Sequence, residues 1–461
     1  MAAQQIVQLV VTEQAASIPL TYQSTGAAVS QGATTIPTNS YAALTQPSDL
    51  TPLLAAGLVI SSITWSASTA TVTTAVNIPG LSVGDTFWTK ITGATPAGYN
   101  GTYFATVTGA NTFTFTLLVN PGAETVPGTY TPPNQVELLS MVTTFFGEGS
   151  STQLYVLELG SGDQTTGPAL LYAWDQASPN VFYSYLVPRS WDNTAGFLAL
   201  QASYQSPSAA KYFFVTTTAA TYTNYTAAMK CVLGLIEAPS VIPPEFSWAD
   251  AFEAALSYNP GPAGRMTPFA YKFMYGVTPY PTQGNNALLT AIANGNCNVV
   301  ATGAQGGSSN NILWNGKCFD GNDFSWWYAA DWVQLNGKRA LASAIINGNN
   351  NPLAPIVYNQ IGITALQNVL FKIFKQAVAY NLLNGNIVLT TLDPTTFANN
   401  LLNGAYAGSN VINAVPFSTY TSLNPTQYAA KNYGGLYAVG IPQNGFNTIV
   451  FNFLITNLLS Q

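Results

Sequence analysis

The sequence predicts an α+β protein of several domains, with a mixed core of sheet and helices, terminal strand arms and one inserted all-β domain. The chain has 461 residues, a length that favours about three domains. Hydrophobic residues make up 48% of it, so a large core can form. Strand-like and helix-like segments alternate along most of the chain, and this alternation is typical of layered folds.

The first 20 residues are expected to form an N-terminal strand arm. Residues 6–11 are rich in Val and Ile and predict a strand. The stretch 26–32 that follows is rich in Gly, Ala and Ser and predicts a loop, so no hairpin partner lies close by in sequence. The strand must therefore pair with a distant segment or with another chain. Farther along, Ser48 is a suitable N-cap for a short helix that ends at Gly57.

Residues 59–131 differ from their surroundings. Thr and Val dominate, and turn residues recur every 8 to 12 positions or so. The dipeptides Gly84-Asp85 and Asn100-Gly101 are typical of tight turns between antiparallel strands. We therefore expect an inserted small β-domain at 59–131, which could be removed while the rest of the chain still folds.

Residues 132–330 return to alternating strands and helices and, together with 21–58, are expected to form the α/β part of the molecule. The expected helices lie at 136–149, between 160 and 181, from 195 onward, between 218 and 238, and at 248–258. The expected strands are the apolar runs 154–160, 181–188, 211–218, 271–276 and 298–304.

Residues 331–446 are expected to form a C-terminal α+β domain. Two helices are predicted between 325 and 385, and the second ends at Gly385. Its apolar stripe consists of Leu366, Val369, Leu370, Ile373 and Val378. A strand is expected at 436–441, and residues 447–461 form the C-terminal strand arm, with its strand at 449–455.

The charge content excludes several classes of protein. Only 7% of the residues are charged, and 12 basic against 18 acidic residues give a net charge of -6. Nucleic-acid binding requires clustered Lys and Arg, so it is not expected. Disorder is also a poor fit, because 9 Trp, 25 Tyr and 23 Phe supply much apolar area. The absence of histidine rules out Ser-His-Asp and Cys-His nucleophiles and histidine metal sites.

The cysteines and the hydropathy give two further expectations. Cys231, Cys297 and Cys318 have no CxxC spacing, so buried, reduced thiols in a protein made in the cytoplasm are expected. No secretory signal is recognisable at the N-terminus. No apolar run reaches the ~18 residues that a membrane span needs, so membrane insertion is not expected.

The low charge itself suggests assembly. A monomer of this size usually keeps a charged surface for solubility, whereas much of this surface must consist of neutral polar side chains. Such a surface suits a subunit that packs against copies of itself. The alternative is an ordinary secreted protein with a neutral surface.

The acidic residues could carry chemistry in two places. Asp320, Asp323 and Asp331 lie close in sequence, but their spacing does not match an EF-hand loop, so a turn before a helix start is the simpler interpretation. Glu245, Asp250 and Glu253 fit acidic side chains at the beginning of a helix.

An aromatic group and a glycine-rich stretch are two further candidates for a binding site. Trp326, Trp327, Tyr328 and Trp332 could form a sugar-stacking platform, which with paired carboxylates could make a glycosidase. Core packing is the commoner outcome for aromatic residues at helical spacing. Gly303, Gly306 and Gly307 do not form a GxGxxG motif. No catalytic, cofactor-binding or metal-binding residue is therefore assigned, and the protein is not expected to be an enzyme.

Several stretches taken together resemble the phage tail-sheath-like family, the subunits of contractile bacteriophage tails. They are LTQPSDL, MVTTFFGEGSSTQLYVLELG, FYSYLVPRSWD, EAPS, YGVTPYP, the DG…WWYAADW segment and NPLAPIVYNQIGITALQNVL. The resemblance covers nearly all of the chain outside 59–131 and rests on the order and spacing of these stretches. Residues 59–131 separately resemble a small β-domain that recurs in phage structural proteins.

The resemblance implies a structural role. Sheath subunits polymerise as stacked rings around an inner tail tube and contract to drive that tube through the host envelope. The implied partners are further copies of the chain, the inner tube protein, the baseplate and the tail terminator, with no cofactor. The implied location is the virion tail, after synthesis in the host bacterial cytoplasm.

The family also implies roles for particular residues. Its N- and C-terminal arms add strands to a neighbour's sheet, which points here to Ile6, Val7, Leu9, Val11, Ile449, Phe451, Phe453 and Ile455. Its C-terminal domain faces the tube, which is often acidic. Lys372 and Lys375, three residues apart on one helix face, are therefore expected to contact the tube, although a solvated helix face would show the same spacing. The alternative function is another virion component, such as a receptor-binding or decoration protein that recognises glycans.

Overall fold

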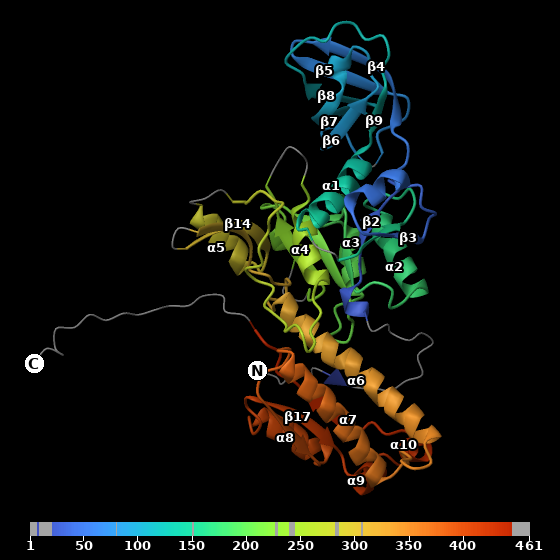
Figure 1. The fold of residues 1–461 in the computed structure, drawn as a ribbon, viewed down its shortest axis with the longest axis vertical. Coiled ribbons are helices and arrows are strands. Elements are labelled where there is room, and N and C mark those ends of the chain that lie inside the picture. Colours follow the sequence, from blue (N-terminus) through green and yellow to red (C-terminus); the bar gives the residue numbers. More distant parts are fainter. Residues whose placement is uncertain are drawn as a thin grey trace, which may run out of the picture.

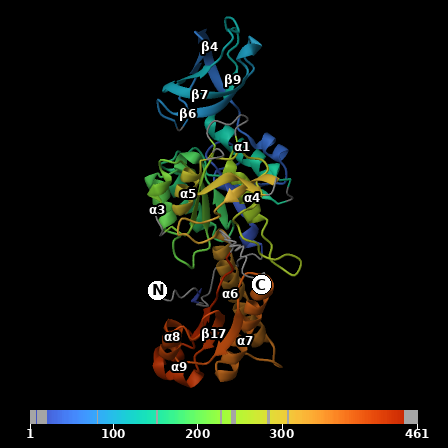
Figure 2. The same ribbon diagram turned by 90° about the vertical axis from the view of Figure 1, so that its left-hand side faces the viewer.

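The computed structural model describes residues 7–8, 21–79, 81–149, 152–225, 229–238, 245–281, 285–305 and 308–444. It confirms the α+β class, with three units arranged along the longest axis (Figure 1). A barrel lies at one end, a sheet covered by helices lies in the middle, and a helical unit with a smaller sheet lies at the other end (Figure 2). None of the helices among these residues is long and apolar enough to cross a membrane.

The central unit is built on an eight-stranded sheet with the order β15-β14-β13-β12-β11-β2-β10-β3. The six inner strands are parallel, and antiparallel strands β15 and β3 flank them. The strands are β2 (Gly26–Ser30), β3 (Ser40–Leu44), β10 (Leu154–Glu158), β11 (Ser184–Leu186), β12 (Tyr212–Thr217), β13 (Val232–Ile236), β14 (Asn298–Gln305) and β15 (Ser308–Trp314).

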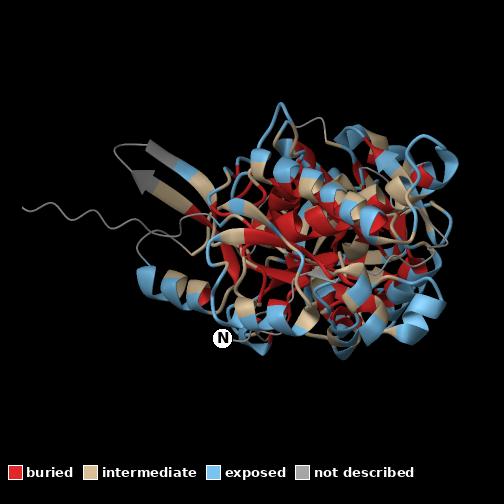
Figure 3. Cartoon of the chain, turned by 90° about the horizontal axis from the view of Figure 1, so that it is seen from below, coloured by how far each residue is buried: buried red, intermediate tan, exposed pale blue. Residues whose placement is uncertain are grey.

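Helices cover both faces of this sheet. They are α1 (Pro133–Gly147), α2 (Gly167–Ala177), α3 (Ala195–Ala202), α4 (Ser247–Leu256) and α5 (Asn286–Asn294). Neighbouring strand residues therefore enter different cores: Phe213 packs with α2, α3 and α5, whereas Phe214 packs with α1 and α4. Burial on both faces explains the continuous apolar runs of these strands, and Figure 3 shows the buried residues concentrated in the interior.

Three local predictions for this unit are wrong. Residues 26–32 are not a loop, since Gly26–Ser30 forms β2 near the middle of the sheet. Residues 218–238 contain β13 rather than a helix, preceded by only a short 3-10 turn at Tyr222–Asn224. Residues 271–276 follow the edge of β15 through one isolated bridge, Phe273 to Ile312, and do not form a strand.

The short helix expected after Ser48 is a 3-10 helix, Pro47–Leu53. Pro52 lies inside it, and a proline there removes a backbone donor and disfavours a continuous α-helix. The Asp49 carboxylate accepts hydrogen bonds from the backbone and side chain of Gln46 and so caps the turn.

The barrel consists of six antiparallel strands closed in the order β4-β5-β8-β7-β6-β9. They are β4 (Leu58–Ser66), β5 (Thr69–Thr74), β6 (Thr86–Thr92), β7 (Gly101–Gly109), β8 (Thr112–Thr116) and β9 (Thr129–Thr131). Alternating residues such as Val72, Phe113 and Tyr130 fill a core that is separate from the other two units. The barrel leads directly into α1, so this helix carries it above the sheet (Figure 1).

The C-terminal unit begins with α6 (Phe324–Asn350), which starts in the central unit and runs out of it (Figure 2). Helix α7 (Gln360–Ala379) packs back against α6. The ring of Trp332 in α6 lies edge to face with the ring of Tyr380, the C-cap of α7, and the ring centroids are 5.9 Å apart. A four-stranded sheet follows the order β1-β18-β17-β16. The remaining elements are β1 (Val7–Gln8), β16 (Asn386–Thr390), α8 (Pro394–Leu402), β17 (Ser409–Ala414), α9 (Phe417–Leu423), α10 (Pro425–Ala429) and β18 (Leu436–Val439).

Candidate assembly surfaces

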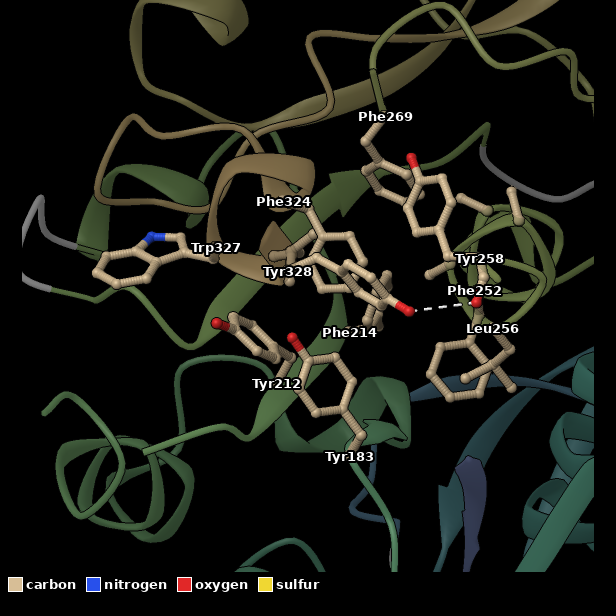
Figure 4. Close-up of a cluster of buried hydrophobic side chains, with 14 of the residues drawn as sticks. Tyr183, Tyr212, Phe214, Phe252, Leu256, Tyr258, Phe269, Phe324, Trp327 and Tyr328 are labelled. Carbon is tan, nitrogen blue, oxygen red and sulfur yellow. Dashed lines mark hydrogen bonds between the residues drawn. The ribbon is translucent and has the colours of Figure 1, made fainter. Parts of the chain in front are cut away.

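Of the four aromatic residues that could have formed a sugar platform, Trp327 and Tyr328 lie in the core, and Trp326 and Trp332 are half-buried and pack against it. Tyr328 is 2% exposed and its hydroxyl donates to the Tyr258 carbonyl oxygen at 3.2 Å (Figure 4). Trp327 is also buried, and its indole N–H donates to the Asp320 carboxylate at 2.8 Å. These rings join the beginning of α6 to the central sheet, so they are unavailable to an external ligand.

Asp320, Asp323 and Asp331, which lie close to these aromatic residues in sequence, also take part in contacts within the fold. The Asp331 carboxylate accepts hydrogen bonds from the hydroxyls of Tyr183 and Tyr212, both at 2.8 Å. Burial raises the pKa of Asp331. Asp320 closes a turn with Asn322, and Asp323 lies at the N-cap position of α6. Among the described residues, no group of three Asp, Glu or Cys side chains is placed to hold a metal ion.

In the second acidic group, which consists of Glu245, Asp250 and Glu253, Asp250 is buried and is not an exposed charge at the start of a helix. Asp250 is 1% exposed on α4 and lies beside the Glu148 carboxylate. Burial and the neighbouring Glu148 carboxylate raise its pKa to about 9. Asp250 is therefore protonated at neutral pH. Glu245, by contrast, accepts hydrogen bonds from the backbone and hydroxyl of Thr278.

The ion pairs found among the described residues all lie in the central unit. Arg189 follows β11 and pairs with Glu137 of α1 and with Glu237, next to β13. It thereby ties the helix that carries the barrel to the central sheet. Lys211 pairs with Asp175 at 2.6 Å in a buried site. Two tyrosine hydroxyls also donate to Asp175, from Tyr185 at 2.7 Å and Tyr204 at 2.6 Å.

The three cysteines are free and buried. Burial raises the pKa of Cys231 to about 12 and also raises the pKa of Cys297 and Cys318. None of them is therefore a reactive thiol at neutral pH.

The N-terminal strand pairs within its own chain in this structure. Val7 lies opposite Ala438 and Gln8 lies opposite Tyr437, so β1 is an antiparallel neighbour of β18. The outer edge of β18 can thus accept a strand from the N-terminal arm. Of the other arm residues, Ile6, Leu9 and Val11 lie outside the described residues, as do Ile449, Phe451, Phe453 and Ile455.

The opposite edge of the same sheet is formed by β16. Among the described strands, β16 pairs only with β17, to which it is parallel. Its Leu389 side chain is 41% exposed. An unpaired edge that presents apolar side chains is a template for strand addition.

The two lysines proposed from the sequence lie on the outer face of α7. Lys372 and Lys375 are both exposed. The inner face of the helix is buried and includes Leu370, Phe374 and Ala377. In the described part of the chain, no carboxylate lies within ion-pair distance of either lysine, so both charges are available to a partner.

The part of the chain that follows Asp331 differs in charge from the part before it. From residue 332 onward the sequence has five basic residues and one acidic residue, a net charge of +4, whereas residues 1–331 carry -10. The acidic residue is Asp393, which caps α8 by accepting from the backbone N–H groups of Thr395 and Thr396. A count of charges along the chain would have revealed this difference.

Comparison with solved structures identifies the fold. A chain of the anti-feeding prophage (AFP) baseplate matches with a TM-score of 0.53 and 12% sequence identity, covering 97% of this chain and 98% of that one. A sheath tail protein from Listeria innocua matches with a TM-score of 0.38 and 10% identity, over 80% of this chain and 86% of that one. No protein-family model matches the sequence, and no curated protein matches it.

The baseplate chain shares the fold of this protein over nearly its whole length. The tail-sheath-like fold indicated by the sequence motifs is therefore confirmed at the level of the fold.

Proposed function

We propose that this protein is a structural subunit of a contractile phage tail sheath, which polymerises around an inner tube and contracts to drive it through the host envelope. The observation that carries the proposal is the sheet edge at β18, which accepts an N-terminal strand. The fold shared with a chain of the AFP baseplate supports the same conclusion. The buried and hydrogen-bonded carboxylates of the central unit support a structural role over an enzymatic one.

The arms would join subunits by exchange. The pair of β1 with β18 is only two residues long, so it contributes on the order of 1–2 kcal/mol. In a ring, the arm of a neighbour is held near the same edge, and its effective concentration can exceed that of free protein. The neighbour's arm then replaces the chain's own arm at β18, as in domain swapping. The C-terminal arm, 447–461, would add to a neighbour's sheet in the same manner, and the β16 edge is suited to accept it.

The tube would be contacted by the C-terminal unit through Lys372 and Lys375. Both are exposed and lie apart from any described carboxylate. Each exposed ion pair gives only about 0.2–1 kcal/mol, but every subunit along the tail would repeat the contact. The baseplate and the tail terminator would bind the two ends of the sheath.

Arm exchange can be tested with single cysteines. Chains that carry Val7→Cys are mixed with chains that carry Ala438→Cys, assembled and then oxidised. Directly opposed residues of an antiparallel pair are close enough for a disulfide, so we expect disulfide-linked dimers between the two kinds of chain. The three natural cysteines are buried and should not interfere.

The control is Leu436→Cys in place of Ala438→Cys. Leu436 is on the same strand, where it pairs with Ala414, but it lies two residues away from Ala438, the residue opposite Val7. Striated tubes in negative-stain micrographs of the same samples would support the sheath. Assemblies that give no mixed dimers, or as many with the Leu436 variant, would contradict arm exchange at β18.

The alternative function, recognition of glycans by another virion component, has one structural observation in its favour. Trp88 and Phe104 face each other across β6 and β7 with ring centroids 5.1 Å apart, and Phe104 is 41% exposed. Aromatic faces of this kind can stack on sugars. Compact trimers in micrographs, instead of tubes, would favour this alternative.

A further inference from the structure

We propose that the cavity between the barrel and the central sheet binds a linear polyamine, an organic cation whose ammonium groups are spaced along an aliphatic chain. The cavity has a volume of about 840 Å³, which lies within the range of small-molecule sites. Its walls are the barrel strands β6 and β7, helix α1 and the ends of the central strands (Figure 1). The site goes beyond the sheath role proposed above and does not depend on it.

The cavity lies at the edge of the central sheet where the parallel strands have their carboxyl ends. Ser30, at the end of β2, and Arg189, just after β11, both line it. β2 is the first strand of the sheet in the chain, the next parallel strand, β10, lies on one side of it, and β11 lies on the other. The strand order therefore reverses between β2 and β11. In open α/β sheets, ligands bind in the crevice outside the carboxyl ends of the strands at such a reversal.

The described residues that line the cavity are strongly acidic. Six of the chain's 18 acidic residues are among them, and Arg189 is the one basic residue. The six are Asp85, Glu137, Asp163, Asp192, Glu237 and Glu245. Six carboxylates and one guanidinium give a net formal charge of -5. The cavity therefore disfavours phosphates, nucleotides and other anions, and it attracts cations.

Helix N-termini explain part of this acidity but do not balance it. Glu237, for example, accepts a hydrogen bond from the backbone N–H of Ser247, the first residue of α4. Helices α1 to α4 begin at this edge of the sheet, and each N-terminus carries about half a positive charge, so the four offset about two of the negative charges. Burial raises the pKa of Glu137 although Arg189 is its ion-pair partner. The protein alone therefore does not fully compensate the charge of the Glu137 carboxylate.

The carboxylates are spread along the cavity and do not meet at one point. Asp85 belongs to the barrel, Glu137 to α1, and Asp192 to the segment before α3. In the part of the chain that the structure describes, no three Asp, Glu or Cys side chains are placed to hold a metal ion. Separate ammonium groups on one extended ligand match this distribution, whereas a single compact metal ion does not.

Two further side chains suit the parts of a polyamine. Trp88 of β6 is half-buried and lines the cavity together with Phe104. The face of an indole ring attracts an ammonium group, and the ring also offers apolar area to the methylene groups. Thr216, at the end of β12, also lines the cavity and is 6% exposed, and its hydroxyl has no hydrogen-bond partner in the described structure. A ligand ammonium group can supply the missing donor.

Isothermal titration calorimetry of the full chain with spermidine, at constant ionic strength, tests the site. Asp85→Asn with Asp163→Asn removes two charges, and the amide oxygens can still accept the local hydrogen bonds from backbone N–H groups. We expect spermidine binding to weaken about two- to five-fold for each charge lost. Thr216→Val should weaken binding about ten-fold, because a hydrogen bond to a charged group is lost. It should not lower the free energy of unfolding, since the hydroxyl has no partner within the described structure.

The matched control is Asp49→Asn with Asp393→Asn, which removes two charges from exposed, capping aspartates that are not among the lining residues. Equal losses of binding in the two double variants would overturn the site, because net charge alone would then explain binding. Spermidine that fails to bind the unaltered chain would also overturn it.

Two other ligands test the chemical class. Binding of Mg²⁺ that equals binding of spermidine at the same ionic strength would overturn the preference for an extended cation. Binding of the neutral sugar maltotriose, without binding of spermidine, would overturn the polyamine site and favour recognition of glycans. The cysteine cross-links judge the sheath role separately, so either proposal can fail without the other.

Discussion

The central and C-terminal units use their charged residues in opposite ways. In the central unit, several charges are shielded and paired with one another, as in Lys211 with Asp175 and Arg189 with Glu137. In the C-terminal unit, Lys372 and Lys375 are exposed and have no such partner among the described residues. Charges of the first kind hold one chain together, whereas charges of the second kind are available to another molecule. In a chain with so few charges, this difference separates the folding surfaces from the candidate assembly surfaces.

The largest expected effect is the loss of a buried carboxylate in the central unit. Asp175 holds Lys211 and accepts from two tyrosine hydroxyls. Asp175→Ala leaves a buried ammonium without its partner, so we expect the free energy of unfolding to fall by about 3–5 kcal/mol. Denaturant titration measures this fall.

The comparison in the C-terminal unit is Asp393→Ala, which removes only the exposed cap of α8. Loss of such a cap costs about 1 kcal/mol. If the two variants were equally destabilised, the contrast between the units would be wrong.

A second prediction concerns the tight contact of the central sheet with α4. A Cβ added to Gly26 would come within 2.6 Å of the Phe252 ring and 2.7 Å of the Leu256 side chain, and both side chains are buried. Gly26→Ala should therefore cost about 1–3 kcal/mol of stability through overpacking. At Gly147 an added Cβ meets nothing within 4 Å, so Gly147→Ala should not destabilise the protein. A tolerated Gly26→Ala would show that α4 can move away from β2.

A third prediction uses the buried Asp250. Its pKa is raised to about 9 by burial and by the Glu148 carboxylate, whereas an aspartate in the unfolded chain ionises near pH 4 or so. Between these values the folded chain binds a proton that the unfolded chain does not, so raising the pH destabilises the folded state. Asp250→Asn removes this dependence.

Unfolding free energies of both chains at several pH values between 5 and 9 measure the effect. We expect the difference between Asp250→Asn and the unaltered chain to shift in favour of the variant as the pH rises. A constant difference over this range would mean that Asp250 is already ionised in the folded protein.

The sequence predicts the parts of the fold whose burial leaves a clear pattern. β12 is apolar over its whole length because both of its faces are covered, and the apolar stripe of α7 marks its buried side. The small residues Gly26, Ala27 and Ala28 predict a loop at β2. Gly26 has no side chain because Phe252 and Leu256 of α4 pack closely against it. The residues of β13 predict a helix equally well, since the periodicity of a short apolar run does not distinguish a strand from a helix.

The candidate surfaces were predicted less completely, for a different reason. Lys372 and Lys375 could be found because they are close in sequence on one helix. The sequence indicated that the N-terminal strand needs a distant partner, but it did not identify β18 as that partner. Contacts between distant segments depend on the tertiary fold and leave no local pattern.

The smallest expected effect on stability comes from replacing the exposed lysines. This prediction tests most directly whether the exposed charges of the C-terminal unit serve a partner and not the fold. Lys372→Glu with Lys375→Glu changes two solvated side chains that make no ion pair in the described structure. Their replacement should change the free energy of unfolding by no more than about 0.5 kcal/mol. The same double variant should nevertheless weaken co-assembly on purified inner tube, and more so at low salt, because an exposed electrostatic contact is strongest where screening is least. Sedimentation of tube-bound chain at two salt concentrations, beside a denaturant titration, separates the two effects. Unchanged co-assembly at low salt would eliminate this face of α7 as the tube contact, and a large loss of stability would mean that the lysines serve the fold and not a partner.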